Sequence, residues 1–302
     1  MSFTGTVKNE ITTLSLSATA KIALISGFFR NNYQIIKDDI IISSENDGVI
    51  NYLKDLIDSY EEISYKEELL DNNNFSKNKL KALIIVKGAT FVRETFCLDS
   101  EVVPSYLVES DDEVRAYLRG VFLSCGSIND PKTSRYHLEF LISKKDEVIF
   151  VQKLLNNYDL NVKLLNRDKG FMLYVKEADK ISDFLKIIGT SKAVLYYEEI
   201  RVYRDAKNKT NRLNNCEQAN MDRVIDSAME QLNYIKILED NMATSLLDDK
   251  TKEALEFRKK YQEASLKELS EIISLETGKK ITKSGLNHRF RKIKELALRF
   301  ME

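Results

Sequence analysis

The sequence predicts an α+β fold in which two copies of an αββαββα unit are followed by an all-α domain with a helix-turn-helix. Two apolar helical segments align without a gap, and the same order of strand-like and helical runs follows each of them. Near the C-terminus, a glycine-containing turn separates two amphipathic helices. We expect the duplicated domain over residues 1–200, with repeats of about 1–105 and 106–200, a basic loop and helical connector over 201–245, and the helix-turn-helix domain over 246–302.

The first repeat is expected to open with a helix that Ser17 caps and that carries Ile25-Ser26-Gly27-Phe28-Phe29. Short apolar runs after it predict strands, and apolar residues at three- and four-residue spacing predict a helix between them. In chain order, the expected elements are strands at 34–36 and 40–43, a helix at 47–60, strands at 63–70 and 81–86 on either side of the turn Asp71–Asn74, and a closing helix at 90–97.

The second repeat is expected to open at Ser110-Asp111-Asp112-Glu113, an S-x-x-E capping box. This helix carries Leu118-Arg119-Gly120-Val121-Phe122, which aligns with the first apolar segment at a separation of about 93 residues. The residues Tyr136–Ser143 then alternate as a strand with Leu138, Phe140 and Ile142 on one face. The expected remainder is a helix at 147–157, strands at 162–166 and 171–175 with a turn at 167–170, and a closing helix at 178–188.

The connector begins with the basic stretch 201–212, which we expect to be a loop that touches phosphates or docks the two domains, or a solvated loop without either role. A long amphipathic helix is predicted over 214–239. The C-terminal domain is expected to hold a helix at 249–262, a second helix opened by the capping box of Ser265 and Glu268, a turn at Gly278, and a third helix at 282–300. The residues expected to bury the third helix are Leu286, Phe290, Ile293 and Ala297.

Composition excludes several classes of site and of protein. The chain has 302 residues with three cysteines and two histidines, which argues against a disulfide framework, a cysteine zinc site and a multi-histidine metal centre. The longest apolar stretch near the N-terminus, 22–29, is far shorter than the roughly 20 residues that span a bilayer, and it lacks signal-peptide order. We therefore expect a cytoplasmic protein that has no membrane partner.

The net charge of −1 averages two unlike halves of the chain. Residues 1–200 carry 25 Lys and Arg against 30 Asp and Glu, a net charge of −5. Residues 201–302 carry 21 against 17, a net charge of +4. Such asymmetry points to a segment that faces nucleic acid.

Two helices with an L-x-G-Φ-Φ-like core (Φ apolar), each opening an αββαββα unit, resemble the LAGLIDADG fold. The segment 117–131, which reads YLRGVFLSCGSINDP, resembles the signature of the WhiA family of DNA-binding regulators of Gram-positive bacteria. The resemblance implies that the two motif helices pack together about a pseudo-twofold, with Gly27 and Gly120 allowing a close approach of the backbones. It also implies a regulator acting in transcription, sporulation, or cell division and chromosome segregation.

LAGLIDADG nucleases carry an acidic residue near the end of each motif helix, and the pair binds a divalent metal. On this chain those acidic positions fall on Asn32 and Cys125, and the motif's other acidic positions fall on Arg30 and Leu123. An amide and a thiol do not replace the carboxylates that hold Mg²⁺. We therefore predict a catalytically inactive nuclease fold with no catalytic residue, metal or cofactor. The alternative is an active LAGLIDADG-type endonuclease, against which the two missing carboxylates argue.

The third C-terminal helix carries the prediction of DNA binding. From Lys279 to Lys294 there are seven Lys and Arg and no acidic residue, whereas a solvated helix face usually mixes both signs. The N-terminal part of such a helix enters the major groove, so the candidate base-reading residues are Lys283, Ser284, Asn287 and His288. The candidate phosphate contacts are Lys279, Lys280, Arg289, Arg291 and Lys292.

The sequence thus predicts a non-enzymatic, nucleoid-associated protein whose partner is double-stranded DNA. A rival reading is a scaffold whose acidic N-terminal domain binds protein partners while the helix-turn-helix only tethers it to DNA. The −5 charge of residues 1–200 suits DNA poorly, so a protein partner on the LAGLIDADG-like domain remains part of the prediction.

Overall fold

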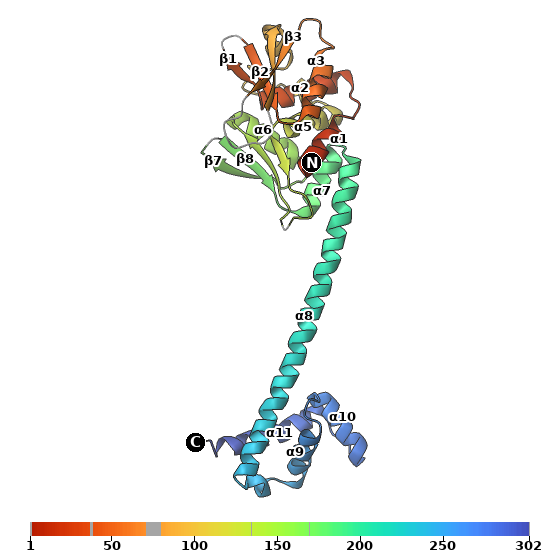
Figure 1. Cartoon of the computed structure of the whole chain (residues 1–302), viewed down its shortest axis with the longest axis vertical. Helices are drawn as coiled ribbons and strands as arrows, with labels where there is room; N and C mark the ends of the chain where they lie inside the picture. Colours follow the sequence, from red (N-terminus) through yellow and green to blue (C-terminus); the bar gives the residue numbers. More distant parts are fainter. Residues whose placement is uncertain (1, 37–38, 71–79, 134, 169, 302) are drawn as a thin grey trace. The chain divides into compact units, whose positions relative to one another are not determined.

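The computed structural model describes residues 2–36, 39–70, 80–133, 135–168 and 170–301 (Figure 1). The chain forms two compact units, Met1–Arg204 and Asp205–Glu302. No helix among the described residues is both long enough and apolar enough to cross a membrane.

The first unit contains the predicted duplication. After helix α1 (Phe3–Ile11), the first repeat consists of α2 (Ala18–Arg30), β1 (Gln34–Ile36), β2 (Asp39–Ser44), α3 (Asp47–Ile57), β3 (Ser64–Leu70), β4 (Leu80–Lys87) and α4 (Ala89–Thr95). After a short 3₁₀ turn (Ser105–Val108), the second repeat consists of α5 (Asp111–Cys125), β5 (Gly126–Ile128), β6 (Leu138–Ile142), α6 (Lys145–Asn156), β7 (Lys163–Arg167), β8 (Gly170–Val175) and α7 (Ala178–Ile187). The αββαββα order is confirmed in both repeats. The expected turn at 71–74 and Lys169 of the turn at 167–170 lie outside the described residues.

Each repeat forms its own four-stranded antiparallel sheet. The strand order is β1-β2-β4-β3 in the first sheet and β5-β6-β8-β7 in the second, so the two sheets have the same topology. The registers are also equivalent: Ile40 pairs with Ile85 in the first sheet, and Leu138 pairs with Val175 in the second. These four side chains are buried in one continuous core.

Helix α1 and strand β5 were not predicted, and neither was the start of α8 within this unit. Helix α1 buries Phe3, Val7 and Ile11, which recur every four residues and pack into the common core. Strand β5 is three residues long and begins directly where α5 ends, so no separate apolar run marks it in the sequence. It pairs with β6 and completes the second sheet.

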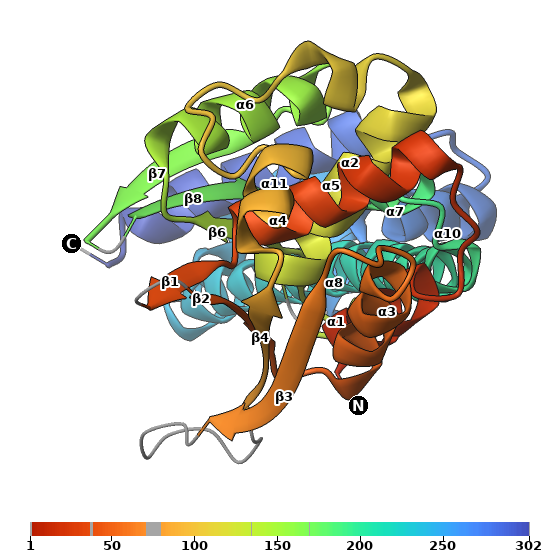
Figure 2. The same cartoon turned by 90° about the horizontal axis from the view of Figure 1, so that it is seen from above.

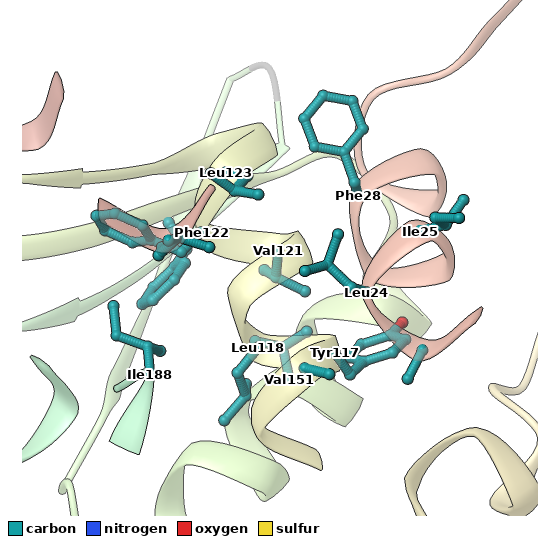
Figure 3. Packing of buried hydrophobic residues seen from close by; sticks show 14 of the residues in the cluster. Leu24, Ile25, Phe28, Tyr117, Leu118, Val121, Phe122, Leu123, Val151 and Ile188 are labelled. Atoms are coloured by element: carbon teal, nitrogen blue, oxygen red, sulfur yellow. The ribbon is translucent and has the colours of Figure 1, made fainter. Parts of the chain in front are cut away.

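The motif helices α2 and α5 lie side by side at the centre of the first unit (Figure 2). Leu24 and Phe28 of α2 lie in the same buried cluster as Tyr117 and Val121 of α5 (Figure 3). A Cβ atom on Gly27 would lie 2.3 Å from the Tyr117 carbonyl oxygen, and one on Gly120 would lie 2.0 Å from the Leu24 carbonyl oxygen. The expected close approach of the two backbones is therefore confirmed, and only glycine permits it.

The second unit is all-α. It contains the C-terminal part of α8 (Ser191–Asp240), a short 3₁₀ turn (Ala243–Leu246), α9 (Asp249–Lys260), α10 (Leu266–Thr277) and α11 (Lys283–Leu298). Figure 1 shows α9, α10 and α11 gathered around the C-terminal end of α8. Leu286, Phe290, Ile293 and Ala297 are buried as predicted, and the core they share also includes Ile235 and Leu238 of α8.

The expected loop at 201–212 is wrong, because these residues lie within the uninterrupted helix α8. The basic composition of this stretch favours a loop. However, α8 contains neither glycine nor proline, and Lys, Arg and Ala are good helix formers. A high density of charge is compatible with an exposed helix, and residues 205–223 of α8 are exposed.

Candidate nucleic-acid interface

The turn between α10 and α11 has a geometry fixed by local hydrogen bonds. Ser265 caps α10 by accepting a hydrogen bond from the Glu268 amide at 3.2 Å, while the Glu268 carboxylate accepts one from the Ser265 amide at 2.8 Å. Gly278 ends the helix in the left-handed region with φ of 67°. Thr282 then caps α11 through its hydroxyl, which accepts a hydrogen bond from the Gly285 amide at 3.1 Å. Both helix starts and the turn are therefore specified by their own residues.

The four candidate base-reading residues lie together on the first turns of α11. Lys283, Ser284, Asn287 and His288 are all exposed. The opposite face of the helix buries Leu286 and other apolar residues in the core of the unit. The structure therefore brings the four side chains onto one accessible surface at the N-terminal end of the helix.

The cations that follow divide into two groups. Lys279, Lys280 and Arg291 are exposed and form no ion pair with any residue that the structure describes. Three others are paired with carboxylates: Arg289 Nη1 lies 3.2 Å from Glu253, Lys292 Nζ lies 3.2 Å from Asp248, and Lys294 Nζ lies 2.8 Å from Glu230. Although the segment 279–294 contains no acidic residue, these three of its seven cations are paired, because their partners come from α8, from α9 and from the residue that caps α9.

Arg289 also contributes to the packing of the unit. It is half-buried, and its guanidinium donates a hydrogen bond to the Lys250 carbonyl oxygen at 2.9 Å. Asp248, the partner of Lys292, caps α9; hydrogen bonds from Thr251, together with the Lys292 ammonium, lower the pKa of its carboxyl to about 2. Arg289 and Lys292 thus join α11 to α9 as well as flanking its exposed face.

Sequence reasoning missed two cations beside this surface. Arg223 of α8 and Lys267 of α10 line the same recess as Lys283, and this recess has a volume of about 220 Å³. Lys267 is the second residue of α10, two positions after the capping residue Ser265. The capping box therefore could have placed Lys267 at the start of this helix. Arg223 comes from a helix distant in sequence, and no local pattern points to it.

Asn32 and Cys125, which stand where LAGLIDADG nucleases have acidic residues, each form a hydrogen bond within the first unit. The Asn32 side-chain oxygen accepts a hydrogen bond from the Ser43 amide at 2.7 Å, which holds the end of α2 against β2. The Cys125 thiol donates to the Val121 carbonyl oxygen at 3.3 Å, and burial raises the pKa of this thiol to about 11. A neutral thiol and an amide offer no carboxylate oxygen to a hard divalent cation. No group of three or more His, Cys, Asp or Glu among the described residues could hold a metal ion.

A lysine that sequence reasoning missed lies at the same place. Lys8 of α1 donates a hydrogen bond from Nζ to the Leu123 carbonyl oxygen at 3.0 Å, near the C-terminal end of α5. Burial lowers the pKa of its ammonium. Lys8, Asn32 and Ser124 line one polar recess of about 780 Å³, so a side-chain cation lies beside the ends of both motif helices.

Arg30 lies at another motif position and forms a buried ion pair. Its Nε lies 2.8 Å from Glu147 of α6, and both side chains are almost fully buried. The Tyr117 hydroxyl donates to the same carboxylate at 2.5 Å. This network joins the first repeat to the second, so the position serves packing between the repeats.

Comparisons with known proteins agree over both units. Residues 114–207 match the sequence model of the WhiA LAGLIDADG-like domain, and residues 210–297 match that of the WhiA C-terminal HTH domain. A protein of Bacillus cytotoxicus named "Probable cell division protein WhiA" is 38% identical over 308 residues, covering 98% of this chain and 96% of its own length. A protein of the same name from Bacillus cereus is 37% identical with the same coverage.

Solved structures share the fold. The full-length DUF199/WhiA from Thermatoga maritima superposes with a TM-score of 0.61 and 22% identity, covering 99% of each chain. The N-terminal LAGLIDADG domain of DUF199/WhiA superposes with a TM-score of 0.50 and 20% identity, covering 62% of this chain and 90% of that one. At these identities, the likeness concerns the fold alone.

Proposed function

The chain belongs to the WhiA family, and from this premise we propose that it is a DNA-binding regulator without nuclease activity. Its curated relatives carry the name of a probable cell division protein. We infer that this chain regulates transcription of genes for cell division, chromosome segregation or sporulation, and that it acts in the cytoplasm at the nucleoid. DNA binding by the second unit is the biochemical basis of the proposal.

The observation that carries the proposal is the exposed N-terminal part of α11. Lys283, Ser284, Asn287 and His288 lie there on one accessible face, after a turn of helix-turn-helix geometry. Such a helix places its first residues against base edges in the major groove. Asn287 suits bidentate contact with adenine, and Lys283 suits guanine.

Phosphate contacts would come from the cations that flank this face. Lys279, Lys280 and Arg291 are free to serve because no described carboxylate pairs with them. We also propose Arg289 and Lys292 as phosphate contacts. Their ion pairs with Glu253 and Asp248 reduce the contribution of each to DNA affinity. Five to seven such contacts correspond to a slope of about −4.5 to −6 in the logarithm of affinity against the logarithm of salt concentration.

The absence of nuclease activity follows from the residues at the motif helix ends. Asn32 and Cys125 offer no carboxylate oxygen, and the Lys8 ammonium adds a positive charge beside them. Glu45 and Asp47 also line this recess, but the motif helices themselves place no carboxylate there for the divalent cation that phosphodiester cleavage needs. The acidic first unit is therefore free for another role, and we include a protein partner on it in the proposal.

The test is duplex binding by the full chain. We would sequence the genomic fragments that the protein retains and then measure its affinity for a retained site by fluorescence anisotropy across salt concentrations. We expect Asn287→Ala to cost about 1–3 kcal/mol on the retained site, and much less on a mixed-sequence duplex. Arg291→Gln should weaken binding to both duplexes and reduce the salt slope by about 1.

Arg289→Gln is the matched control for Arg291→Gln, since it removes the same charge from a residue that already pairs with Glu253. It should affect thermal stability more and duplex affinity less than Arg291→Gln does. Equal affinity of unaltered protein, Asn287→Ala and Arg291→Gln for both duplexes would contradict the assignment of α11 as the recognition helix.

A further inference from the structure

A small recess lies between α8 and the N-terminal ends of α10 and α11. It is lined by four basic residues and no acidic residue, namely Arg223, Arg258, Lys267 and Lys283. Its volume is about 220 Å³, and the polar residues Ser227 and Ser265 also line it. The four cations come from α8, α9, α10 and α11, and all of the lining residues lie in the second unit.

Three of these cations form no ion pair among the described residues. Arg223, Lys267 and Lys283 are exposed, and none of them has an ion-pair partner within the described ranges. Cations elsewhere in the same unit do find carboxylates, among them Lys259 with Glu239 and Lys260 with Glu276. Three unpaired cations around one recess repel one another, and an anion between them would remove that repulsion.

The fourth cation forms the buried side of the recess. Arg258 is only 1% exposed, and its Nη1 donates hydrogen bonds to the carbonyl oxygens of Tyr261, Gln262 and Ala264. Its Nε finds no acceptor in the described part of the chain. A buried N–H of a charged group without a partner is rare in folded proteins, because the group has lost its water. The buried guanidinium therefore adds to this side of the recess a positive charge with which no described carboxylate pairs.

The start of α10 adds a further attraction for an anion. Its first backbone amides have no acceptor within the helix, and the helix dipole is positive at this end. The Glu268 carboxylate is already engaged with the Ser265 amide in the capping box. Glu268 lines the neighbouring groove beside Met221 and Ile225 rather than this recess. The recess therefore combines guanidinium, ammonium and helix-end donors with no competing carboxylate in its lining.

We propose that this recess binds one backbone phosphate of the DNA duplex, next to the bases that α11 faces, and that Arg223 of α8 is thereby part of the DNA-binding surface. The choice of a duplex phosphate over a free anion rests on the proposed function. Lys283 lies at the junction: it lines the recess and begins α11, so the phosphate would be held at the N-terminal edge of the recognition helix. Fixing that phosphate would set the register of α11 in the groove.

The experiment compares two double variants of the full chain on a labelled mixed-sequence duplex. Arg223→Gln with Lys267→Gln removes two exposed cations of the recess and leaves Arg258 and its loop contacts intact. Lys236→Gln with Arg299→Gln removes one lysine and one arginine that are exposed in the same unit and do not line the recess. We expect the recess variant to bind about fivefold or more weakly, and its salt slope to fall by about 0.9, the value of one lost phosphate contact. The control variant should keep the slope of the unaltered chain.

Thermal melting in inorganic phosphate distinguishes the two sources of the anion. Stabilisation of the unaltered chain that the recess variant loses, together with the weaker duplex binding, supports the proposal. If the recess variant and the control variant bind the duplex with equal affinity and slope, the proposal is overturned, and loss of phosphate stabilisation alone would make the recess a free-anion site. Failure of the unaltered chain to bind any duplex would overturn the proposed function and this inference together.

Discussion

At the scale of single residues, the motif positions show how one fold supports a different chemistry. Arg30 pairs with Glu147 inside the core, Asn32 holds Ser43, and the Cys125 thiol donates to its own helix. Each of these side chains has a hydrogen-bond or ion-pair partner within the first unit, and none of the three is a carboxylate. Removing one partner of the Arg30–Glu147 pair would leave a buried charge alone, which typically costs about 3–5 kcal/mol.

The three cysteines give a direct check of these surroundings. Cys216 is exposed, Cys97 is buried, and burial raises the pKa of Cys125 to about 11. Because the thiolate is the reactive form, only about one Cys125 side chain in a thousand is reactive at pH 8. We expect iodoacetamide to modify the native protein at Cys216 alone, as measured by mass spectrometry of the intact chain and of its peptides.

The control is the same labelling in urea, which should modify all three cysteines. Raising the pH toward 11 under native conditions should increase labelling of Cys125, since its thiolate population grows as pH approaches the folded pKa. Labelling of Cys125 at pH 8 as fast as that of Cys216 would contradict its placement at the end of α5.

At the scale of elements, the turn between α10 and α11 controls how the recognition helix is presented. Gly278 adopts φ of 67°, and a Cβ atom there would meet no atom within 4 Å. Substitution therefore costs backbone strain without a clash. We expect Gly278→Ala to destabilise the protein by about 1 kcal/mol and Gly278→Asn by less, because asparagine adopts the left-handed region more readily. Urea unfolding followed by circular dichroism measures both values.

If both substitutions leave the urea midpoint of unfolding unchanged, the prediction that the left-handed conformation at Gly278 requires glycine for stability is wrong. Weaker duplex binding by Gly278→Ala under conditions where it remains folded would link the turn geometry to the presentation of α11. Gly285→Ala is a comparison from inside α11, where no positive φ is required and the nearest atom to an added Cβ is at 3.4 Å.

Elements with a local signature were predictable from the sequence, and those without one were not. The capping boxes at Ser110 and Ser265 marked the starts of α5 and α10, and alternating apolar residues marked β6. Strand β5 has only three residues, too few for a period of two to appear. The high charge of residues 201–212 favours a loop, but the absence of glycine and proline from α8 is the signal that agrees with its continuity.

In the candidate site, too, only the features with a local sequence pattern were predictable. The exposed face of α11 could be found from the sequence, because helical periodicity separates Leu286 and Phe290 from Asn287 and His288. The ion-pair partners of Arg289 and Lys292 and the contribution of Arg223 depend on how helices pack, and no local pattern encodes that.

At the scale of the whole molecule, charge divides the two units. Residues 1–200 carry a net charge of −5 and residues 201–302 carry +4, and the candidate DNA-contacting residues all lie in the second part. The second unit also has a core of its own, completed by Ile235 and Leu238 of α8. We expect a fragment of residues 205–302 to fold and to bind a mixed-sequence duplex with the salt slope of the full chain, and a fragment of residues 1–204 not to bind it, as measured by gel shift and anisotropy.

Because a folding failure would imitate loss of binding, circular dichroism of each fragment must show a cooperative melting transition first. The full chain and the fragment of residues 1–204 should also leave supercoiled plasmid intact in Mg²⁺ or Mn²⁺, since Asn32 and Cys125 cannot supply the two carboxylates of a two-strand cut. Duplex binding by the fragment of residues 1–204 alone would reverse the proposed division between the units. Metal-dependent nicking that persists through repurification would mean that the acidic unit still acts on DNA, and its negative charge would then have to be explained by bound cations rather than by a protein partner.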